Sequence, residues 1–583
     1  MRSSMMGFEV QKRSLQVAQK SLDITANNLS NIKTPGYTRQ RVDTASLSLS
    51  SFSPWQSKIS KLSLAGQGVT AFGVSQIRND YLDKRYRDMV PLVKEYDTRV
   101  KIMQELETAL DNIDNFGLLE AFHNLKSAMQ KVSLERADAP EMLLQVRTQA
   151  VNICATLRAY NTELTKMLEA NLEELNFSLS QTNTLLRKIA IYNAAITKEY
   201  IDDAGRIARG EGVSEYGPLE LIDQRNLLLD ELAEYANIEV FANSNGSVRV
   251  IMAGMTVVDD KEFEQIVSKR YNDFGAAVLV FSNGAQFLPK SGELKAYLDL
   301  LNGHGTYAVG AYQSTEFGIP YYLHALDAFA EGFAELMNEV NKGFLSNHLA
   351  WDRNLIWGGS YEYVYDRHGK PLLDVDGVPV RRMEFEYVYD ANGHAVRDIN
   401  GDFVVRRDEN GNPITYPVRT KVTAANIRIS DEWANNPLMI GETYGIMLDN
   451  NGQPQLDADG NPVYGWRVNN LDGSNLHRFV AALEGERRWG RSFDFYGSAF
   501  GYLEFLSDRL GQGIEYTNSM LEKNLDIVHS ILDNRDAISA VSNDEEGVNM
   551  LIYQKWYNAS ARIMTTMDEA LDTVINRMGR VGL

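Results

Sequence analysis

Acidic glycine turns are the residues of this chain whose types and spacing come nearest to a ligand site. The pattern Asp-x-[Asp/Asn]-Gly begins at Asp374, Asp390, Asp398, Asp408, Asp449 and Asp457. Carboxylate pairs such as Asp374 with Asp376, and Asp457 with Asp459, could supply oxygen ligands to Ca²⁺. An EF-hand loop places glycine at its sixth position and glutamate at its twelfth, whereas these turns place glycine at the fourth. Because tight hairpin turns also favour Asp and Asn before Gly, we interpret the turns as structural, with calcium binding as the alternative.

Other residue types offer no catalytic arrangement. The 8 histidines are isolated, none begins a His-Glu-x-x-His motif, and neither a phosphate loop nor a Gly-x-Ser-x-Gly elbow is present. Gly66, Gly68 and Gly73 do not have the spacing of a dinucleotide-binding loop. The single cysteine, Cys154, excludes an intramolecular disulfide and a Cys-based metal site, and its apolar helical surroundings predict a buried, unreactive thiol. We therefore expect no catalytic residue, no cofactor and no metal site.

Length and charge narrow the class of protein further. A chain of 583 residues has room for about three or four domains. Its formal net charge of −20 argues against a nucleic-acid-binding protein and against binding to an anionic membrane surface. The sequence has neither a cleavable secretory signal pattern nor an apolar run of about 18 residues, so we expect no membrane insertion.

The first 37 residues contain a narrow apolar stripe with helical spacing. Its members step by three and four residues: Leu15, Ala18, Leu22, Thr25, Leu29 and Ile32. Asn27, Asn28 and Asn31 lie beside it. Because Thr34 precedes Pro35, the helix should end at Thr34, and Pro35-Gly36 should occupy the centre of a type II turn. Such a stripe needs a partner outside its own helix.

The last 40 residues carry a second stripe of the same kind. Its members are Val548, Ile552, Ala559, Ile563, Met567, Ala570, Val574 and Met578. The two ends of the chain should therefore pair with one another or with another subunit. The predicted assembly interface comprises Leu15, Leu22, Asn27, Asn28, Leu29, Ile32, Pro35, Gly36, Tyr37, Val548, Ile552, Ile563, Met567 and Val574.

Both ends also resemble a known family. The run ANNLSNIKTPGY, ending at Tyr37, resembles the N-terminal signature of the axial proteins of the bacterial flagellum, which are its rod, hook and hook-associated proteins. The run DEEGVNMLIYQKWYNASARIMTTMDEALDTVI, beginning at Asp544, resembles their C-terminal signature. In the middle of the chain, LIDQRNLLLDELA (221–233) resembles a segment of the hook-associated members that the shorter rod and hook proteins lack.

The resemblance implies a structural protein at the hook–filament junction, which self-assembles and contacts different proteins below and above. Its implied partners are further copies in a ring or tubular layer, the hook protein, a second junction hook-associated protein and a cytoplasmic export chaperone. It implies export without a cleaved signal and an extracellular place in the flagellum. The implied fold places the terminal helices in an inner tube.

Periodicity along the chain predicts a mainly α fold with inserted β structure. Residues 38–75 suit short strands, 79–200 and 471 to the end suit helices, 201–218 suit a loop, and 219–259 suit a helix followed by a hairpin with an Asn245-Gly246 turn. A further helix is expected at 323–344. Aromatic–charged alternation and the repeated YVYD unit at Tyr363 and Tyr387 predict a hairpin-rich β insert.

These elements predict a terminal α-helical coiled coil, an elongated helical bundle and an outer all-β region. The predicted regions are a coiled-coil assembly core (1–78 with 531–583), a helical scaffold (79–240 with 291–345 and 471–530), a β-hairpin subregion (238–290) and an inserted outer β domain (350–466). We interpret Asp223 and Arg225 as a helix cap or surface ion pair, or alternatively as a charged pair that fixes the helix-to-hairpin geometry.

Two alternatives for the function stay open. A hook or distal-rod protein with an insertion would share the terminal signatures but should lack the 219–233 segment. An axial protein whose exposed insert binds calcium or glycan would use the acidic turns, or stack sugars on aromatic side chains. The candidate tyrosines are Tyr361, Tyr363, Tyr365, Tyr387 and Tyr389, although cross-strand packing is the commoner use of such residues.

Overall fold

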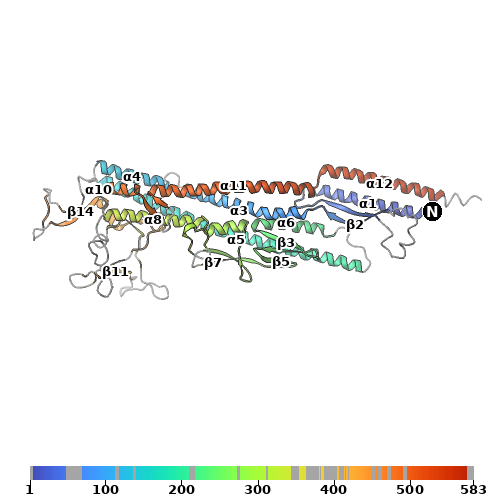
Figure 1. Ribbon diagram of the computed structural model, residues 1–583, viewed down its shortest axis with the longest axis horizontal. Helices are drawn as coiled ribbons and strands as arrows, with labels where there is room; N and C mark the ends of the chain where they lie inside the picture. Colours follow the sequence, from blue (N-terminus) through green and yellow to red (C-terminus); the bar gives the residue numbers. More distant parts are fainter. Residues whose placement is uncertain are drawn as a thin grey trace, which may run out of the picture.

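The computed structural model shows an elongated molecule built mainly of long helices (Figure 1). It describes residues 4–573 except 47–67, 112–116, 136–139, 209–216, 272–275, 310–312, 343–352, 448–452, 457–461, 469–473 and 490–494, and except most of 361–418. The mainly α fold with inserted β structure that the sequence predicts is confirmed.

Helices provide most of the described structure. They are α1 (Ser4–Ser30), α3 (Asp80–Asp111), α4 (Leu118–Glu135), α5 (Pro140–Ala208), α6 (Leu219–Tyr235), α7 (Glu293–Leu301), α8 (Ile319–Lys342), α9 (Asp431–Asn435), α10 (Ser474–Glu484), α11 (Ala499–Ser539) and α12 (Asn543–Asp572), with 3₁₀ turns η2 (Gly305–Tyr307) and η4 (Pro437–Gly441). At 69 residues, α5 is about 100 Å long at the usual rise of an α-helix.

Strands form small antiparallel sheets beside the helices. They are β1 (Gln40–Ser46), β2 (Val69–Gln76), β3 (Ile238–Ala242), β4 (Val248–Met252), β5 (Met255–Asp259), β6 (Glu262–Phe263), β7 (Ile266–Tyr271), β8 (Ala276–Phe281), β9 (Gln286–Phe287), β10 (Ile356–Trp357), β11 (Met383–Phe385), β12 (Thr415–Pro417), β13 (Arg428–Ile429), β14 (Glu442–Ile446), β15 (Tyr464–Val468), β16 (Arg487–Trp489) and β17 (Phe495–Gly497). The largest described sheet has four strands in the order β3-β4-β5-β6.

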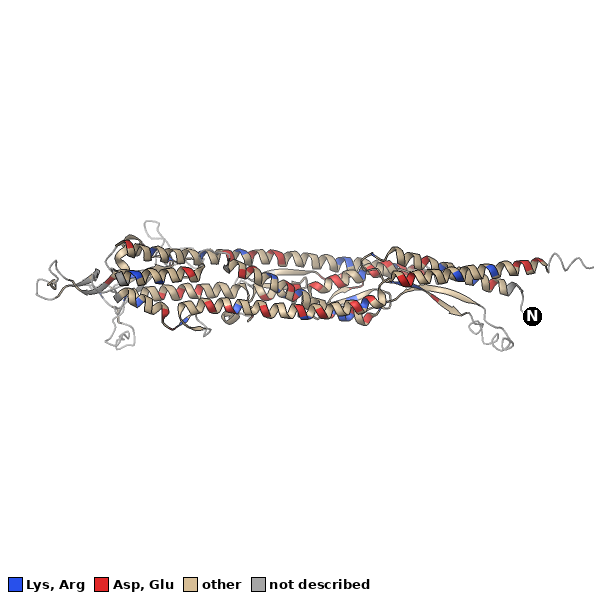
Figure 2. Ribbon diagram, turned by 90° about the horizontal axis from the view of Figure 1, so that it is seen from above, with Lys and Arg blue, Asp and Glu red and all other residues tan. Residues whose placement is uncertain are grey.

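Two helix pairs follow one another along the long axis. At one end α1 lies beside α12, and further along α3 lies beside α11, while α4, α10 and β14 lie toward the opposite end (Figure 1). Acidic and basic side chains are interspersed along the whole length of the helices (Figure 2). The two ends of the chain therefore meet at one end of the rod.

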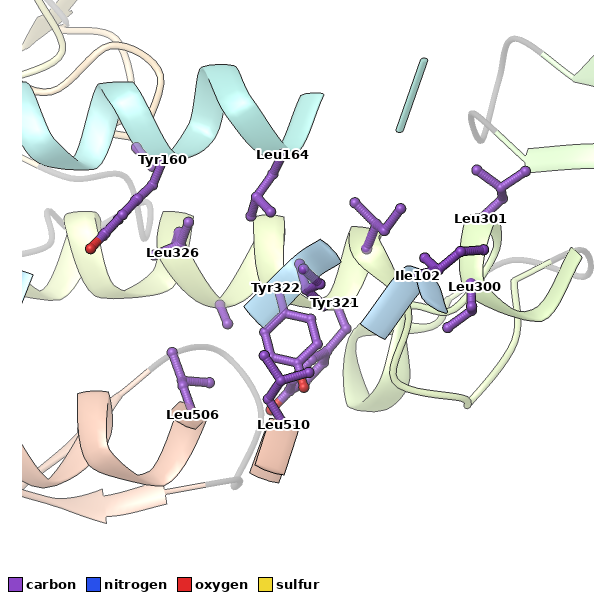
Figure 3. Close-up of a cluster of buried hydrophobic side chains, with 14 of the residues drawn as sticks. Ile102, Tyr160, Leu164, Leu300, Leu301, Tyr321, Tyr322, Leu326, Leu506 and Leu510 are labelled. Atoms are coloured by element: carbon purple, nitrogen blue, oxygen red, sulfur yellow. The ribbon is translucent and has the colours of Figure 1, made fainter. Parts of the chain in front are cut away.

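The core is a continuous column of apolar side chains between the helices. Tyr321, Tyr322 and Leu326 on α8 meet Leu506 and Leu510 on α11, as Figure 3 shows. The predicted apolar face of the 323–344 helix is confirmed at its centre, because Phe329 and Phe333 are fully buried. Burying such side chains is the main favourable free energy of folding, at about 1.5–3 kcal/mol each.

Asparagines on α5 attach the sheets to this helical core. The Asn193 amide donates to the carbonyl oxygens of Val248 and Asp260 and accepts from the Val248 N–H, at 2.8–3.0 Å. Asn183 makes the same two-way contact with Ile266, at 2.7 and 2.9 Å. Each asparagine thus replaces the missing neighbour of a strand end, which satisfies backbone groups that burial would otherwise leave unpaired.

Several boundaries differ from the sequence prediction. α1 ends at Ser30 rather than Thr34, and α5 continues to Ala208 through most of the first half of the predicted 201–218 loop, where the only glycine is Gly205. The C-terminal part is not helical throughout, because the β16–β17 hairpin follows α10. Its Trp489 stacks on Phe329, with ring centroids 5.3 Å apart, so tertiary packing decides this short segment.

The strands after Tyr37 and the hairpin around Asn245-Gly246 are confirmed. Most of the 350–466 insert lies outside the described residues, including the acidic turns at 374, 390, 398, 408, 449 and 457 and the five candidate tyrosines. Its described parts include the paired strands β11 and β12, and the β14–β15 pair near the predicted 447–466 hairpin. The division of the chain into four regions stays a prediction.

We expect Asn193→Ala to lower the free energy of unfolding by about 3 kcal/mol, because it leaves buried backbone groups of Val248 and Asp260 without partners. Urea unfolding of the full chain measures this change. Asn152→Ala on the exposed face of α5 is the matched control and should stay within about 0.5 kcal/mol of the unchanged protein. Equal effects of the two substitutions would contradict this role of Asn193.

Candidate functional site: the joint between the terminal helices and the scaffold

The terminal helices α1 and α12 form an antiparallel pair. Near its middle, the hydroxyls of Ser14 and Ser560 lie 2.9 Å apart, and the Trp556 indole N–H donates to the Ser14 hydroxyl at 2.9 Å. Near its scaffold end, the Asn28 amide donates to Glu546 at 3.2 Å. The two ends of the chain therefore meet through polar as well as apolar contacts.

The buried column of α1 lies beside the predicted stripe rather than on it. Its members are Val17, Ala18, Ser21, Ile24, Thr25 and Asn28. The predicted residues Leu15, Leu22 and Leu29 are partly buried, and Ile32, beyond the helix end, is 42% exposed. Ala18 and Thr25 belong to both sets. The four-residue difference at the helix end explains the position of Ile32.

The predicted stripe of α12 mostly faces away from α1. Val548, Ile552 and Ile563 are 56%, 53% and 46% exposed, whereas Met567 is partly buried and approaches Gly7. Val574 lies outside the described residues. The face of α12 that meets α1 instead buries Glu546 and Ser560. One helix thus carries two contact faces, of which only one is used within the chain.

A tight turn connects α1 to the first strand. Gly36 has φ +76°, and the Tyr37 N–H donates to the Thr34 carbonyl at 3.2 Å, as expected for a type II turn centred on Pro35-Gly36. A Cβ at Gly36 would also lie 3.2 Å from Leu227 on α6. Glycine is therefore required both by the backbone and by the close approach of α6.

Asn28 connects this turn to both terminal helices. Its side-chain oxygen accepts from the Tyr37 hydroxyl at 2.8 Å and from the Gln40 N–H at 3.0 Å, and its amide donates to the Gln40 carbonyl at 2.9 Å. Asn27 donates to the same Tyr37 hydroxyl at 3.3 Å. Burial, together with the charges of Asp223, Glu220 and Glu546, raises the pKa of Tyr37, so its hydroxyl keeps its proton.

Arg39 joins the turn to the start of α12. Its guanidinium donates to Glu546 at 2.8 Å and to Glu545 at 2.6 Å, and its backbone N–H donates to the Ser539 carbonyl at the end of α11 at 3.0 Å. Burial alone would lower the pKa of Arg39, but the two glutamates raise it above its ordinary value. This single residue therefore holds both sides of the short linker between α11 and α12.

Thr38 joins the turn to α6. Its N–H and hydroxyl donate to the two carboxylate oxygens of Asp223 at 3.0 and 2.6 Å, and Arg78 lies 3.7 Å from the same carboxylate. Burial raises the pKa of Asp223, while the Thr38 hydrogen bonds and the Arg78 charge oppose that rise. The turn residues 37–39 thus contact α1, α6, α11 and α12.

Asp230 forms a second charged link one turn of helix beyond. It accepts from Arg87 on α3 at 2.7 Å and from Arg535 on α11 at 2.8 Å. The Arg535 guanidinium also lies over the Tyr86 ring, 4.7 Å from its centroid. We call this set of contacts, from Asn28 and residues 37–39 to Asp223, Asp230, Arg535 and Glu546, the joint.

Asp223 and Arg225 form neither a surface pair nor a pair with each other. Both are buried, and Arg225 points to the other side, where it donates to Asn193 at 3.2 Å and to the Gly246 carbonyl at 2.7 Å. Arg225 therefore fixes α6 against the β3–β4 turn, as the second interpretation of this segment supposed for a charged pair. Arg39, Asp230, Arg535 and Glu546 were not predicted as site residues, since only the fold brings them together.

The described residues include no group of three or more His, Cys, Asp or Glu side chains that could hold a metal ion. Cys154 is buried, and burial raises the pKa of its thiol to about 12, so the thiolate is scarce at neutral pH. No helix in the described part of the chain has the length and apolar character needed to cross a membrane.

Both ends of the chain match models of flagellar axial proteins. Residues 8–38 match the family described as flagella basal body rod protein, and residues 535–578 match the flagellar basal body rod FlgEFG protein C-terminal family. These ranges contain α1 with the turn, and almost all of α12. The helix pair and the joint therefore belong to a protein of the flagellar axis.

The middle of the chain identifies the branch. Residues 103–347 match the family described as flagellar hook-associated protein FlgK helical domain. The chain is 26% identical to flagellar hook-associated protein 1 of Bacillus subtilis over 99% of both chains, and 22% identical to that of Escherichia coli over 96% of this chain and 98% of the relative. The chain belongs to the family of flagellar hook-associated protein 1, FlgK, and its role in the flagellum is structural.

A solved structure, that of the flagellar hook junction protein FlgK from Burkholderia pseudomallei, is 14% identical and aligns over 78% of this chain and 100% of its own, with a TM-score of 0.49. The hook or distal-rod alternative is not favoured, because the segment that should distinguish it, 219–233, lies within the matched FlgK helical domain.

We expect Glu546→Gln to destabilise the chain by about 2 kcal/mol, because a neutral amide must turn one N–H₂ donor toward either Asn28 or Arg39, both of which are donors here. Thermal unfolding of the full chain measures this change. Glu545→Gln is the matched control, since the Glu545 side chain is 63% exposed and such pairs contribute about 0–1 kcal/mol. A larger effect of Glu545→Gln would contradict this assignment.

We expect the stability advantage of the unchanged protein over Asp223→Asn to fall as pH rises from the ordinary aspartate pKa of 3.8 toward the raised value in the folded chain. The folded state holds the Asp223 proton more tightly than the unfolded state, so ionisation costs stability across this interval, whereas asparagine cannot ionise. Urea unfolding at several pH values measures the difference. Thr38→Val should steepen it, and an advantage that grows with pH would refute the expectation.

Proposed function

We propose that this chain is the subunit that joins the flagellar hook to the filament, and that it does so by self-assembly into a ring or tubular layer. The observation that carries the proposal is the second face of α12. Apolar side chains there remain exposed although α1 already covers the first face: Val548, Leu551, Ile552 and Ile563, at 56%, 57%, 53% and 46% exposure.

Burial of this face by neighbouring subunits would stabilise an assembly. Each of these side chains contributes about 1.5–3 kcal/mol when it moves from water into an apolar contact. A continuous exposed apolar stripe on a helix is also typical of an interaction surface rather than of a free monomer. In this proposal the predicted interface residues act in two sets: Asn27, Asn28, Pro35, Gly36 and Tyr37 build the joint, and the α12 stripe contacts other subunits.

The family supports assembly with other hook and rod components of the flagellum. We propose that the specific neighbours are the hook protein below and a second junction hook-associated protein above, and that a cytoplasmic chaperone accompanies the chain before export. The chain would reach its extracellular place without a cleaved signal. As a scaffold whose role is assembly, it would not act as an enzyme.

The alternative that the outer insert binds calcium or glycan stays a prediction, because its acidic turns and tyrosines lie outside the described residues. Titration of the full chain with Ca²⁺ or glycans addresses it separately from assembly.

Deletion of the gene in its source strain, followed by electron microscopy, tests the junction role. We expect hooks without filaments and filament protein released to the medium, with filaments restored by the unchanged gene but not by Ile552→Glu, which places a charge on the exposed α12 stripe. Gln554→Glu, on the other exposed flank of α12, is the matched control and should restore filaments. Missing or truncated hooks would place the chain in the hook or rod, and normal filaments would overturn the proposal.

A further inference from the structure

A groove on the scaffold, next to the joint, has features of a peptide-binding site. Its volume is about 640 Å³, and it lies between α3, α6 and strand β3. Lys84 and Arg87 line it from α3, Ile222 and Arg225 from α6, and Phe241 and Ala242 from β3. It is separate from the α12 stripe, since no residue of α12 lines it.

One wall of the groove is the open edge of a sheet. β3 is the outermost strand in the order β3-β4-β5-β6. The Asn243 N–H donates to the Ser247 carbonyl at 2.9 Å at the turn, and hydrogen-bonded pairs alternate along an antiparallel ladder. The peptide groups of Val240 and Ala242 therefore point away from β4 and toward the groove. Such an edge can accept a further extended strand.

The other wall holds a positive charge without a counter-ion. Arg225 is only 6% exposed, its two hydrogen bonds go to the neutral oxygens of Asn193 and Gly246, and its buried Nε has no partner among the described residues. Within the described part of the chain no carboxylate lies within ion-pair distance of it; the nearby Asp223 and Asp230 are used by Thr38, Arg87 and Arg535.

The surroundings make this charge costly. Burial lowers the pKa of Arg225 to about 10, and the charges of Arg87 and Arg78 lower it further in the same direction, while the Tyr200 hydroxyl opposes them. A buried cation in this state gains free energy when a carboxylate approaches, because the approaching charge replaces lost solvation.

We propose that the groove binds an extended, carboxylate-bearing segment of a second copy of this chain, which adds as a strand to the edge of β3 and places its carboxylate against Arg225. The inference rests on the proposed self-assembly and assigns it a second contact. Backbone hydrogen bonds to β3 provide affinity, and the carboxylate fixes the register of the added strand.

Charge favours a second copy as the occupant. The chain has 78 acidic against 58 basic residues, so carboxylates dominate the surface that any neighbouring copy presents. A groove on one copy and a different segment on the next form a heterologous contact, and such contacts continue around a ring or along a helix rather than closing a dimer.

Cross-linking in assembled flagella tests the inference. p-Benzoylphenylalanine replaces Phe241, which is 43% exposed at the rim of the groove, and isolated flagella are irradiated. We expect a homodimer adduct whose partner peptide contains Asp or Glu. Ala242→Pro removes an outward N–H without a ladder hydrogen bond to β4 and should lower the adduct yield about tenfold, whereas Ala242→Ser keeps the N–H and should not.

A second variant guards against misfolding of the proline variant. Lys84→Glu, on an exposed rim position, should also lower the yield by repelling the carboxylate. An adduct with a different protein alone, or a homodimer yield unchanged by both variants, would overturn the inference while the chain is still present in the flagella. Absence of the chain from isolated flagella would instead overturn the proposed function, and the inference with it.

Discussion

The structure depends on satisfying the buried backbone of one short segment, residues 37–40, which crosses from the terminal helices to the scaffold. Buried N–H and C=O groups without partners cost about as much free energy as several apolar contacts provide. Here side chains from other elements supply the partners: Asn28 pairs with both backbone groups of Gln40, and Asp223 accepts the Thr38 N–H. The turn can lie between helices only because those side chains are present.

This arrangement couples elements that are distant in the sequence. Asn28 lies 518 residues from Glu546, and Thr38 lies 185 residues from Asp223, yet each pair forms direct hydrogen bonds. Because the contacts are charged or multiply bonded, they have well-defined geometry as well as energy. The direction of the α1–α12 pair relative to α3, α6 and α11 is therefore set by a few side chains rather than by a broad apolar surface, which suits a subunit whose apolar terminal face must remain free for neighbours.

Local patterns of the sequence were sufficient for much of the fold. The Pro35-Gly36 turn, the Asn245-Gly246 hairpin and the long helical segments follow from backbone preferences and periodicity within a few residues. The face that each terminal helix turns to its partner did not follow, because α12 carries apolar residues on two faces and periodicity cannot say which one meets α1. The β16–β17 hairpin was missed because Trp489 is held by Phe329, more than 150 residues away, at a ring distance of 5.3 Å.

The joint lies at the limit of what one sequence can reveal. Asn28, Tyr37 and Asp223 were visible as unusual residues, but Arg39, Asp230, Arg535 and Glu546 are ordinary charges whose burial only the folded chain creates. Arg225 shows the same effect in reverse: next to Asp223 in the sequence, it suggested a charged pair, yet two residues along a helix point to different sides. The fold separates them, assigns Asp223 to the turn and leaves Arg225 with neutral partners beside an open strand edge. A helix that divides adjacent charges between two surfaces can thus serve the interior of its own subunit and present a binding wall to another.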